Sequence, residues 1–478
     1  MSKRSVKYPV QSTEGTHKLR GALRERQMTM IAIGGVIGAG LFVGSGSAIQ
    51  IAGPATLVAY AAVGIVIVLV MRMLGEMSVN RPESGSFSSY ASRELGSWAG
   101  LSVGWLYAYQ WCITIGFEAV VGAAITHQMF PSIPTWLAAF VFMAALIAVN
   151  FTRVENFGTF EFWFAMIKVA AIVVFLLLGI AAILGMFPGV DAPGMSNLTG
   201  QGGFAPSGWS AVLTASLVVF FSFFGTEVVT IAAGEAEDPV RAVRTGINSV
   251  VWRILLFYVG SIIIIVTLLP WNSTQVAESP YSAVLSNLNI PYAGTAMNII
   301  VLIAVLSCLN AGIYASSRML FSLAARGEAP KILSRTTKSG VPGYAVFAAS
   351  SVGLLTVVAN YFLPTASVYE FLLNSAGGIA VVVYVCITAT HIRSRMRMSA
   401  EERAQLKFKM WLFPALDILV LIVLIAVIGG MANNPSSRES LVLTTVVTAI
   451  AVTIGVIRQR YHRNRPSMLT SPTETERV

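Results

Sequence analysis

The chain contains very little charge. Lysine, arginine, aspartate and glutamate together make up 11% of its 478 residues, whereas apolar residues make up 55%. An ordinary soluble domain carries about 25% charged residues, because its surface has to be hydrated. A water-soluble fold is therefore excluded, and with a mean hydropathy of +0.72 the chain is expected to lie in lipid. About twelve spans of about 20 residues would use roughly half of its length.

Cysteine and histidine are also scarce. The three cysteines (Cys112, Cys308 and Cys386) all fall in apolar runs, and the four histidines are isolated from one another. Neither a disulfide framework nor a Cys/His zinc pattern is available, so we expect no metal and no cofactor. The spans also lack the charged rings or filter repeats of a channel and the residue groupings of a membrane enzyme. The sequence favours neither of these two classes.

Twelve apolar runs follow one another along the chain, at 28–48, 54–71, 98–130, 134–149, 160–187, 209–233, 252–269, 294–324, 344–362, 367–390, 411–431 and 440–457. They predict an all-α integral membrane protein with twelve transmembrane helices in one unit. We divide the chain into a tail (1–27), a helical domain (28–461) and a second tail (462–478). The domain is divided into two inverted repeats, 28–187 and 209–391, followed by helices 11 and 12 at 410–461.

The positive charge lies almost entirely on one side of the predicted membrane. A net charge of +10 would suggest nucleic acid in a soluble chain, but 30 of the 32 cations fall in the tails, in alternate loops or near the ends of the runs that adjoin these loops. Arg438 alone falls in a loop on the other side, and Lys168 lies within a span. The positive-inside rule predicts that both termini are cytoplasmic in a multi-pass protein of the cytoplasmic (inner) membrane. No cleaved signal peptide, nucleic-acid partner or obligatory protein partner is expected; the predicted partners are membrane lipid and a small molecule.

The first apolar run is unusually rich in glycine. Six glycines fall within thirteen residues, at positions 34, 35, 38, 40, 44 and 46. Each costs about 0.8–1 kcal/mol in a helix relative to alanine. The run therefore predicts either a small-residue packing seam or an unwound break, which lipid tolerates only where the backbone lines a cavity.

The sixth apolar run carries a glycine and an acid at mid-depth, Gly225 and Glu227. Interrupted segments at matching places in two halves of a membrane chain are typical of a transporter binding site. Free N–H groups can hold an anion and free carbonyls can hold an ammonium group, so the site suits a zwitterion. The N–H groups are expected at Gly38, Ala39 and Gly40, and the carbonyls at Val36, Phe221 and Phe224. Phe221 is also the first candidate for a gate.

Several stretches resemble the amino acid permeases of the amino acid–polyamine–organocation superfamily. They cover nearly the whole chain and include Gly-Gly-Val-Ile-Gly-Ala-Gly-Leu-Phe at 34–42, Met-Arg-Met-Leu-Gly-Glu-Met at 71–77, Glu-Phe-Trp-Phe-Ala-Met-Ile-Lys at 161–168, Phe-Gly-Thr-Glu at 224–227 and Ser-Ser-Arg-Met-Leu-Phe at 316–321. Within the family, the stretches at 282–291 and 307–317 resemble bacterial 4-aminobutyrate (GABA) permeases.

The resemblance implies a LeuT-type fold in which two inverted five-helix repeats hold substrate at broken helices 1 and 6. It further implies symport of GABA or a close amino acid with protons, sodium not being expected as the coupling ion. The backbone sites of the family carry over onto the residues already nominated, Val36, Gly38, Ala39, Gly40, Phe221, Phe224 and Gly225. Another amino acid (aromatic, basic or small neutral) or an exchange mechanism remains an alternative.

Ionisable groups within spans are expensive and are functional by default. Lys168 either snorkels to the interface or, as the resemblance implies, takes part in proton coupling by losing its proton as the site opens inward. Glu227 either links the unwound segment to neighbouring helices or relays a proton. Glu118 either makes an interhelical hydrogen bond or contacts the substrate amine, and Asn310 either reaches the substrate or joins helices.

Overall fold

A computed structural model describes residue 30 and residues 35–83, 85–152, 154–187, 192–233, 236, 238–433 and 437–463. All regular elements in these ranges are helical, as the apolar runs predicted. The tail 1–27, Gly34 and most of the tail 462–478 lie outside the described residues.

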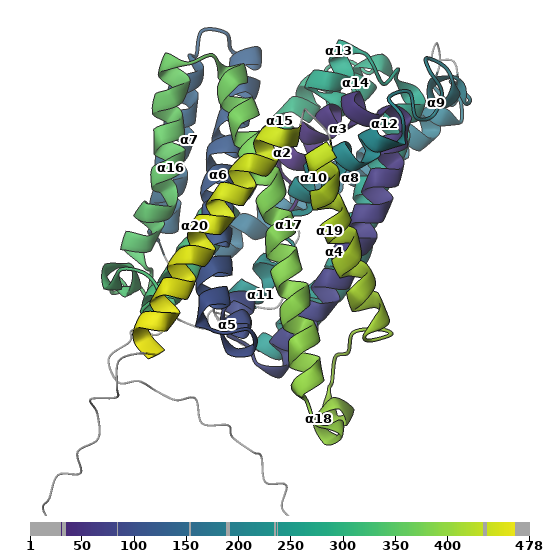
Figure 1. Cartoon of the computed structure of the whole chain (residues 1–478). Helices are drawn as coiled ribbons and strands as arrows, with labels where there is room; N and C mark the ends of the chain where they lie inside the picture. Colours follow the sequence, from purple (N-terminus) through teal and green to yellow (C-terminus); the bar gives the residue numbers. More distant parts are fainter. Residues whose placement is uncertain are drawn as a thin grey trace, which may run out of the picture.

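The long helices form a single bundle (Figure 1). They are α4 (Thr56–Asn80), α6 (Ser97–Met129), α7 (Thr135–Asn150), α8 (Val154–Ile183), α10 (Trp209–Phe223), α12 (Pro239–Leu268), α15 (Ala293–Ala325), α16 (Gly343–Phe362), α17 (Thr365–Arg397), α19 (Ala415–Asn433) and α20 (Arg438–Arg463). The short helices between them are α2 (Ala39–Phe42), α3 (Gly44–Ala52), η1 (Gly53–Ala55), α5 (Ser86–Glu94), α9 (Ser196–Thr199), α11 (Val228–Ala232), α13 (Thr274–Glu278), α14 (Pro280–Asn287), η3 (Lys331–Ser334) and α18 (Ala400–Gln405).

Within the described residues, nine helical segments are long and apolar enough to cross a membrane, and two shorter apolar helices accompany them. One of the nine, Ala39–Asn80, contains the second predicted run and the later part of the first, because the chain turns at η1 and α4 then runs the length of the bundle (Figure 1). The protein is thus a multi-pass membrane protein. The total of twelve crossings stays a prediction.

Large apolar side chains cover the outside of the bundle. Trp163 and Leu177 of α8 are both 63% exposed, and Ile422 of α19 and Ile454 of α20 are 58% and 53% exposed. Continuous apolar exposure of this kind is not stable in water but is the normal state of a surface that faces lipid. Several ionisable groups are buried inside the bundle, among them Glu118, Lys168 and Glu227.

Most predicted runs match helices to within a few residues, but 252–269 does not. The helix α12 already begins at Pro239, where Asp238 caps it by accepting a hydrogen bond from the Arg241 N–H at 3.1 Å. The first turns of α12 carry Arg241 and Arg244, so a search for apolar runs excludes them. The run 252–269 marks only the apolar part of this helix, because hydropathy does not detect helix that continues beyond lipid.

A buried charged cluster joins three helices near the end of the bundle that carries α5 and α18 (Figure 1). His391 of α17 lies between two acids, with Nδ1 at 2.5 Å from Asp417 Oδ1 and Nε2 at 3.3 Å from Glu76 Oε1. Arg395 Nη1 also pairs with Glu76, at 2.6 Å. The cluster ties α4 and α17 to α19, and its buried charges balance when His391 is protonated.

Candidate functional site

Non-helical backbone lies at both places where the glycines predicted a break. Residues 35–38 are not helical, and α2 begins at Ala39 after Gly38 in an extended conformation. Residues 224–227 separate α10 from α11, and Gly225 has φ +110°, a conformation that side chains rarely adopt. Both interruptions leave backbone N–H and C=O groups outside regular helices, deep inside the bundle.

The two unwound segments touch each other and neighbouring helices without room for side chains. A Cβ atom on Gly225 would collide with the carbonyl oxygen of Gly35. One on Gly40 would lie 2.8 Å from the Ser222 Cα, and one on Gly38 would lie 2.6 Å from the Cys308 Cβ. Glycine is therefore needed at all three positions for close packing, and at Gly225 also for its backbone conformation.

Hydrogen bonds through Tyr258 of α12 join the first break to the end of α10. The Tyr258 hydroxyl lies 2.9 Å from the Val36 carbonyl oxygen and 2.8 Å from that of Ser222, so its proton is shared between α10 and the first break. The Ser222 hydroxyl in turn donates to the Gly40 carbonyl oxygen at 2.6 Å. Sequence reasoning missed Tyr258, which is 222 residues from Val36 and resembles any other aromatic residue in an apolar run.

Glu118 of α6 points at the first break. Both of its carboxylate oxygens lie 3.1 Å from the Ala39 N–H, which donates to them, and the side chain is 1% exposed. This is the interhelical hydrogen bond that was one of its two predicted roles. We expected the Ala39 N–H to bind a substrate carboxylate. In this structure it donates to the Glu118 carboxylate instead.

Lys168 of α8 is fully buried, with 0% exposure, so it does not snorkel to the interface. It lies within electrostatic range of Glu161, Cys308 and Glu118. Glu161 is also fully buried, and its Oε1 accepts a hydrogen bond from the Ser307 hydroxyl at 2.6 Å. Sequence reasoning did not nominate Glu161 as a site residue, although seven residues separate it from Lys168 and two helical turns place both on one face.

Asn310 and Glu227 each make the structural contact that was one of their two predicted roles. The Asn310 Oδ1 accepts a hydrogen bond from Asn150 Nδ2 at 2.7 Å, which joins α15 to α7. The Glu227 carboxylate accepts from the Gly225 N–H at 3.1 Å and from the Tyr384 hydroxyl at 3.4 Å, which links the unwound segment to α17. Their roles in substrate binding and proton relay stay predictions.

Aromatic rings close the region around the breaks. The Phe221 ring meets the Phe117 ring edge to face at 5.1 Å, and the Phe224 ring lies 5.3 Å from both Tyr107 and Trp111. Phe221 and Phe224 are 5% and 4% exposed. The site is closed to solvent here, so a ligand can enter only when these rings or their helices move.

Two interrupted helices that meet deep inside an apolar bundle, surrounded by buried ionisable groups, define a secondary transporter. Solved structures share this architecture, including a mutant of the manganese transporter of Eremococcus coleocola (TM-score 0.58, 13% identity, 94% of this chain and 99% of that one). A nucleobase-cation-symport-1 family transporter in a closed conformation also matches (TM-score 0.52, 16% identity, 94% and 96%). At these identities the likeness shows the fold alone, which is the LeuT type.

Sequence comparison shows which family of secondary transporters the chain is similar to. The model of the amino acid permease family matches residues 27–469. The gamma-aminobutyric acid permeases of Bacillus subtilis and Escherichia coli K12 are 49% and 44% identical, over 92% and 91% of this chain and 94% and 93% of their own. The aromatic amino acid transport protein AroP of Corynebacterium glutamicum is 40% identical over 93% of this chain and 96% of its own. The chain belongs to the amino acid permease family, and it is a transporter rather than an enzyme.

Proposed function

We propose that the protein imports 4-aminobutyrate or a closely related amino acid across the cytoplasmic membrane by proton symport, with both termini in the cytoplasm. The observation that carries the choice of substrate is the set of relatives. Those named as GABA permeases or probable GABA permeases are 44–49% identical, whereas the aromatic transporter of Corynebacterium glutamicum is 40% identical.

Glu118 supplies a physical link between substrate and proton. The substrate carboxylate and the Glu118 carboxylate compete for the same N–H group, that of Ala39. Two carboxylates that close together repel each other strongly in a buried site. Substrate therefore binds when Glu118 takes up a proton or turns away toward Lys168, whose ammonium is within electrostatic range.

Lys168 is the group that we propose exchanges its proton during the cycle. The acids within electrostatic range of it are Glu161 on its own helix α8 and Glu118 on α6, and Glu161 in turn accepts a hydrogen bond from Ser307 of α15. A charged Lys168 holds these helices together around the first break, and the same contacts weaken when the proton leaves. Because Glu118 accepts a hydrogen bond from the break and lies within electrostatic range of Lys168, occupancy by substrate and protonation of the lysine become coupled.

The proposal is tested by uptake of labelled GABA into proteoliposomes under an imposed inward proton gradient without sodium. We expect accumulation above equilibrium that collapses with a protonophore. Unlabelled GABA should block it, whereas unlabelled phenylalanine and lysine should not. If another amino acid accumulates in the same assay and GABA does not, GABA is refuted as the substrate, whereas proton symport is still supported.

The same vesicles separate symport from exchange. Vesicles without internal amino acid should accumulate GABA when the gradient is imposed. Uptake that requires preloaded amino acid and ignores the pH gradient would contradict proton symport. Vesicles from the same preparation without protein give the background for both measurements.

A further inference from the structure

A hollow lies away from the two breaks. It is bordered on three sides by α6, by residues 327–331 after α15, and by α20. Its volume is about 670 Å³. This is within the size range of small-molecule sites in proteins. The walls are mostly apolar and aromatic, and include Leu101, Trp105, Tyr109, Val447, Ile450 and Ile454.

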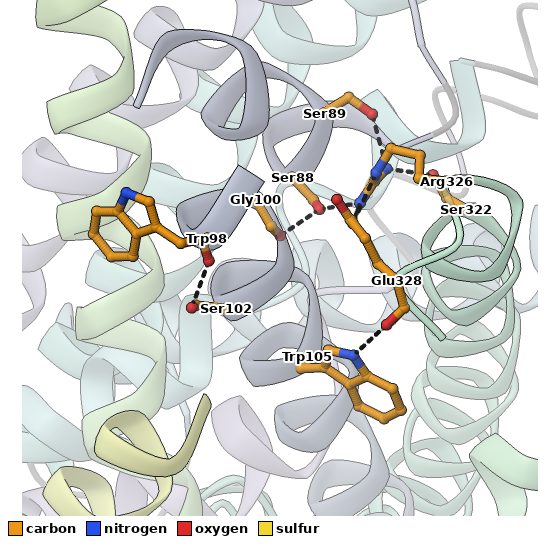
Figure 2. Close-up of polar contacts among 9 residues, drawn as sticks. All are labelled: Ser88, Ser89, Trp98, Gly100, Ser102, Trp105, Ser322, Arg326 and Glu328. Carbon is orange, nitrogen blue, oxygen red and sulfur yellow. Dashed lines mark hydrogen bonds and ion pairs between the residues drawn. The ribbon is translucent and has the colours of Figure 1, made fainter. Parts of the chain in front are cut away.

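The rim of this hollow is built on a rigid polar support, which Figure 2 shows. Arg326 pairs with Glu328 at 2.8 Å and donates to Ser88 Oγ at 2.6 Å, and the Trp105 Nε1–H donates to the Glu328 carbonyl oxygen at 3.1 Å. Glu328 is 9% exposed, and its charge is balanced by Arg326. The negative charge of Glu328 is therefore neutralised by Arg326 and does not repel an anionic ligand at the rim.

Two cations of the rim are not neutralised in this way. Lys331 and Arg458 line the hollow, and among the described residues neither forms an ion pair. Arg458 Nη2 lies 3.7 Å from where a Cβ on Gly327 would be, so its guanidinium reaches from α20 over the loop after α15. The rim carries a net positive charge contributed by two separate segments.

The hollow opens toward lipid at the end of the bundle where the basic loops lie. Ile450 and Ile454 of α20 are 55% and 53% exposed, and they continue the wall of the hollow onto the lipid-facing surface. Lys331 is exposed, in the 325–343 loop that the charge pattern predicts to be cytoplasmic. A ligand here meets apolar wall along its length and two cations at one end.

We propose that this hollow binds an anionic phospholipid of the cytoplasmic leaflet, with an acyl chain against Trp105, Ile450 and Ile454 and the phosphate between Lys331 and Arg458. Basic pockets between transmembrane helices on this side of a membrane are suited to such head groups. The lipid joins α20 to the loop that follows α15. The proposal does not depend on which amino acid is transported.

The test is retention of lipid by the purified full chain in native mass spectrometry, with dioleoyl-phosphatidylglycerol and dioleoyl-phosphatidylcholine offered in equal amounts. We expect one phosphatidylglycerol to be retained in preference to phosphatidylcholine. Each cation near an anionic lipid contributes about fivefold in affinity, so Lys331→Gln with Arg458→Gln should weaken retention by roughly 30-fold. Lys338→Gln with Arg460→Gln removes two exposed cations from the same loop and helix outside the hollow, and should leave retention unchanged.

Ala329→Phe fills the hollow without changing charge and should also abolish preferential retention. Equal retention of the two lipids, or equal losses from the two double variants, would overturn the proposal. So would a shift of the intact protein to a dimer that disappears with Ala329→Phe, because a second copy would then be the occupant. Thermal unfolding of each variant in detergent without added lipid shows whether it is folded, so that loss of lipid is not confused with loss of structure.

Discussion

Gly38→Ala is the substitution whose effect the structure defines most sharply. The new Cβ would lie 2.6 Å from the Cys308 Cβ and 2.5 Å from Glu118 Oε1. The Glu118 carboxylate is the end of a flexible side chain and can turn away. The Cys308 Cβ is attached directly to the backbone of α15, so that the first break and α15 must separate by roughly 1 Å to reach ordinary carbon contact distance.

Overpacking of this kind costs about 1–3 kcal/mol. Because the strain falls on the break itself, we expect substrate affinity to drop by about 5- to 150-fold while insertion into the membrane is unaffected. Equilibrium binding of labelled substrate to purified protein measures the affinity. The yield of folded protein extracted from membranes measures insertion. Gly429→Ala is the matched control, because a Cβ there has no atom within 4 Å.

The identity of the clashing atom provides a stricter test. Adding Cys308→Gly to Gly38→Ala removes the Cβ at 2.6 Å and should restore most of the affinity, less a helix cost of up to about 1 kcal/mol. Adding Cys308→Ala removes only the sulfur at 2.7 Å and should restore little. Wild-type affinity in Gly38→Ala, or equal rescue by the two second substitutions, would refute the reasoning.

Three further predictions concern single side chains. Lys168→Ala should abolish accumulation driven by a pH gradient in proteoliposomes, and preserved proton-coupled uptake would contradict its proposed role. Tyr258→Phe leaves two buried carbonyls without their donor and should lower stability by about 1–3 kcal/mol in thermal unfolding, whereas Tyr344→Phe, at a side chain that is 53% exposed, should change it little. His391→Ala exposes buried acids to each other and should cost about 3–5 kcal/mol, and combining it with Asp417→Ala should cost less than the two separate effects added together.

The arrangement of helices was largely predictable because lipid imposes a simple rule on the sequence. Apolar length predicted α6, α15 and α16 to within one residue at each end. The breaks were predictable because glycine at 38 and 225 is locally costly in a helix, and such a cost has to be compensated by function or packing. Apolar length did not locate the beginning of α12, because its first turns are polar.

The pairings across the bundle were not predictable from one sequence. Glu118 and Ala39 are 79 residues apart, and the orientation of α6 decides that the carboxylate meets this N–H. Asn310 could equally have faced the break, since only the rotation of α15 turns it toward Asn150. Tyr258 has no polar neighbour in sequence that distinguishes it from a packing residue. Such contacts depend on helix rotation, on which apolar length carries no information.

The shared proton of Tyr258 has a consequence for how the transporter works from its two sides. Its hydroxyl contacts the first break and the end of α10 together, and the Ser222 hydroxyl adds a further hydrogen bond to Gly40. We expect segments joined by these hydrogen bonds to move together, so that the region between them keeps its shape while its surroundings rearrange. We therefore expect the half-saturation concentrations on the outer and inner faces to be similar when the pH is equal on both sides. If transport is the proton symport that we propose, its direction depends on the proton gradient alone, and reversing that gradient should produce export with equal affinity.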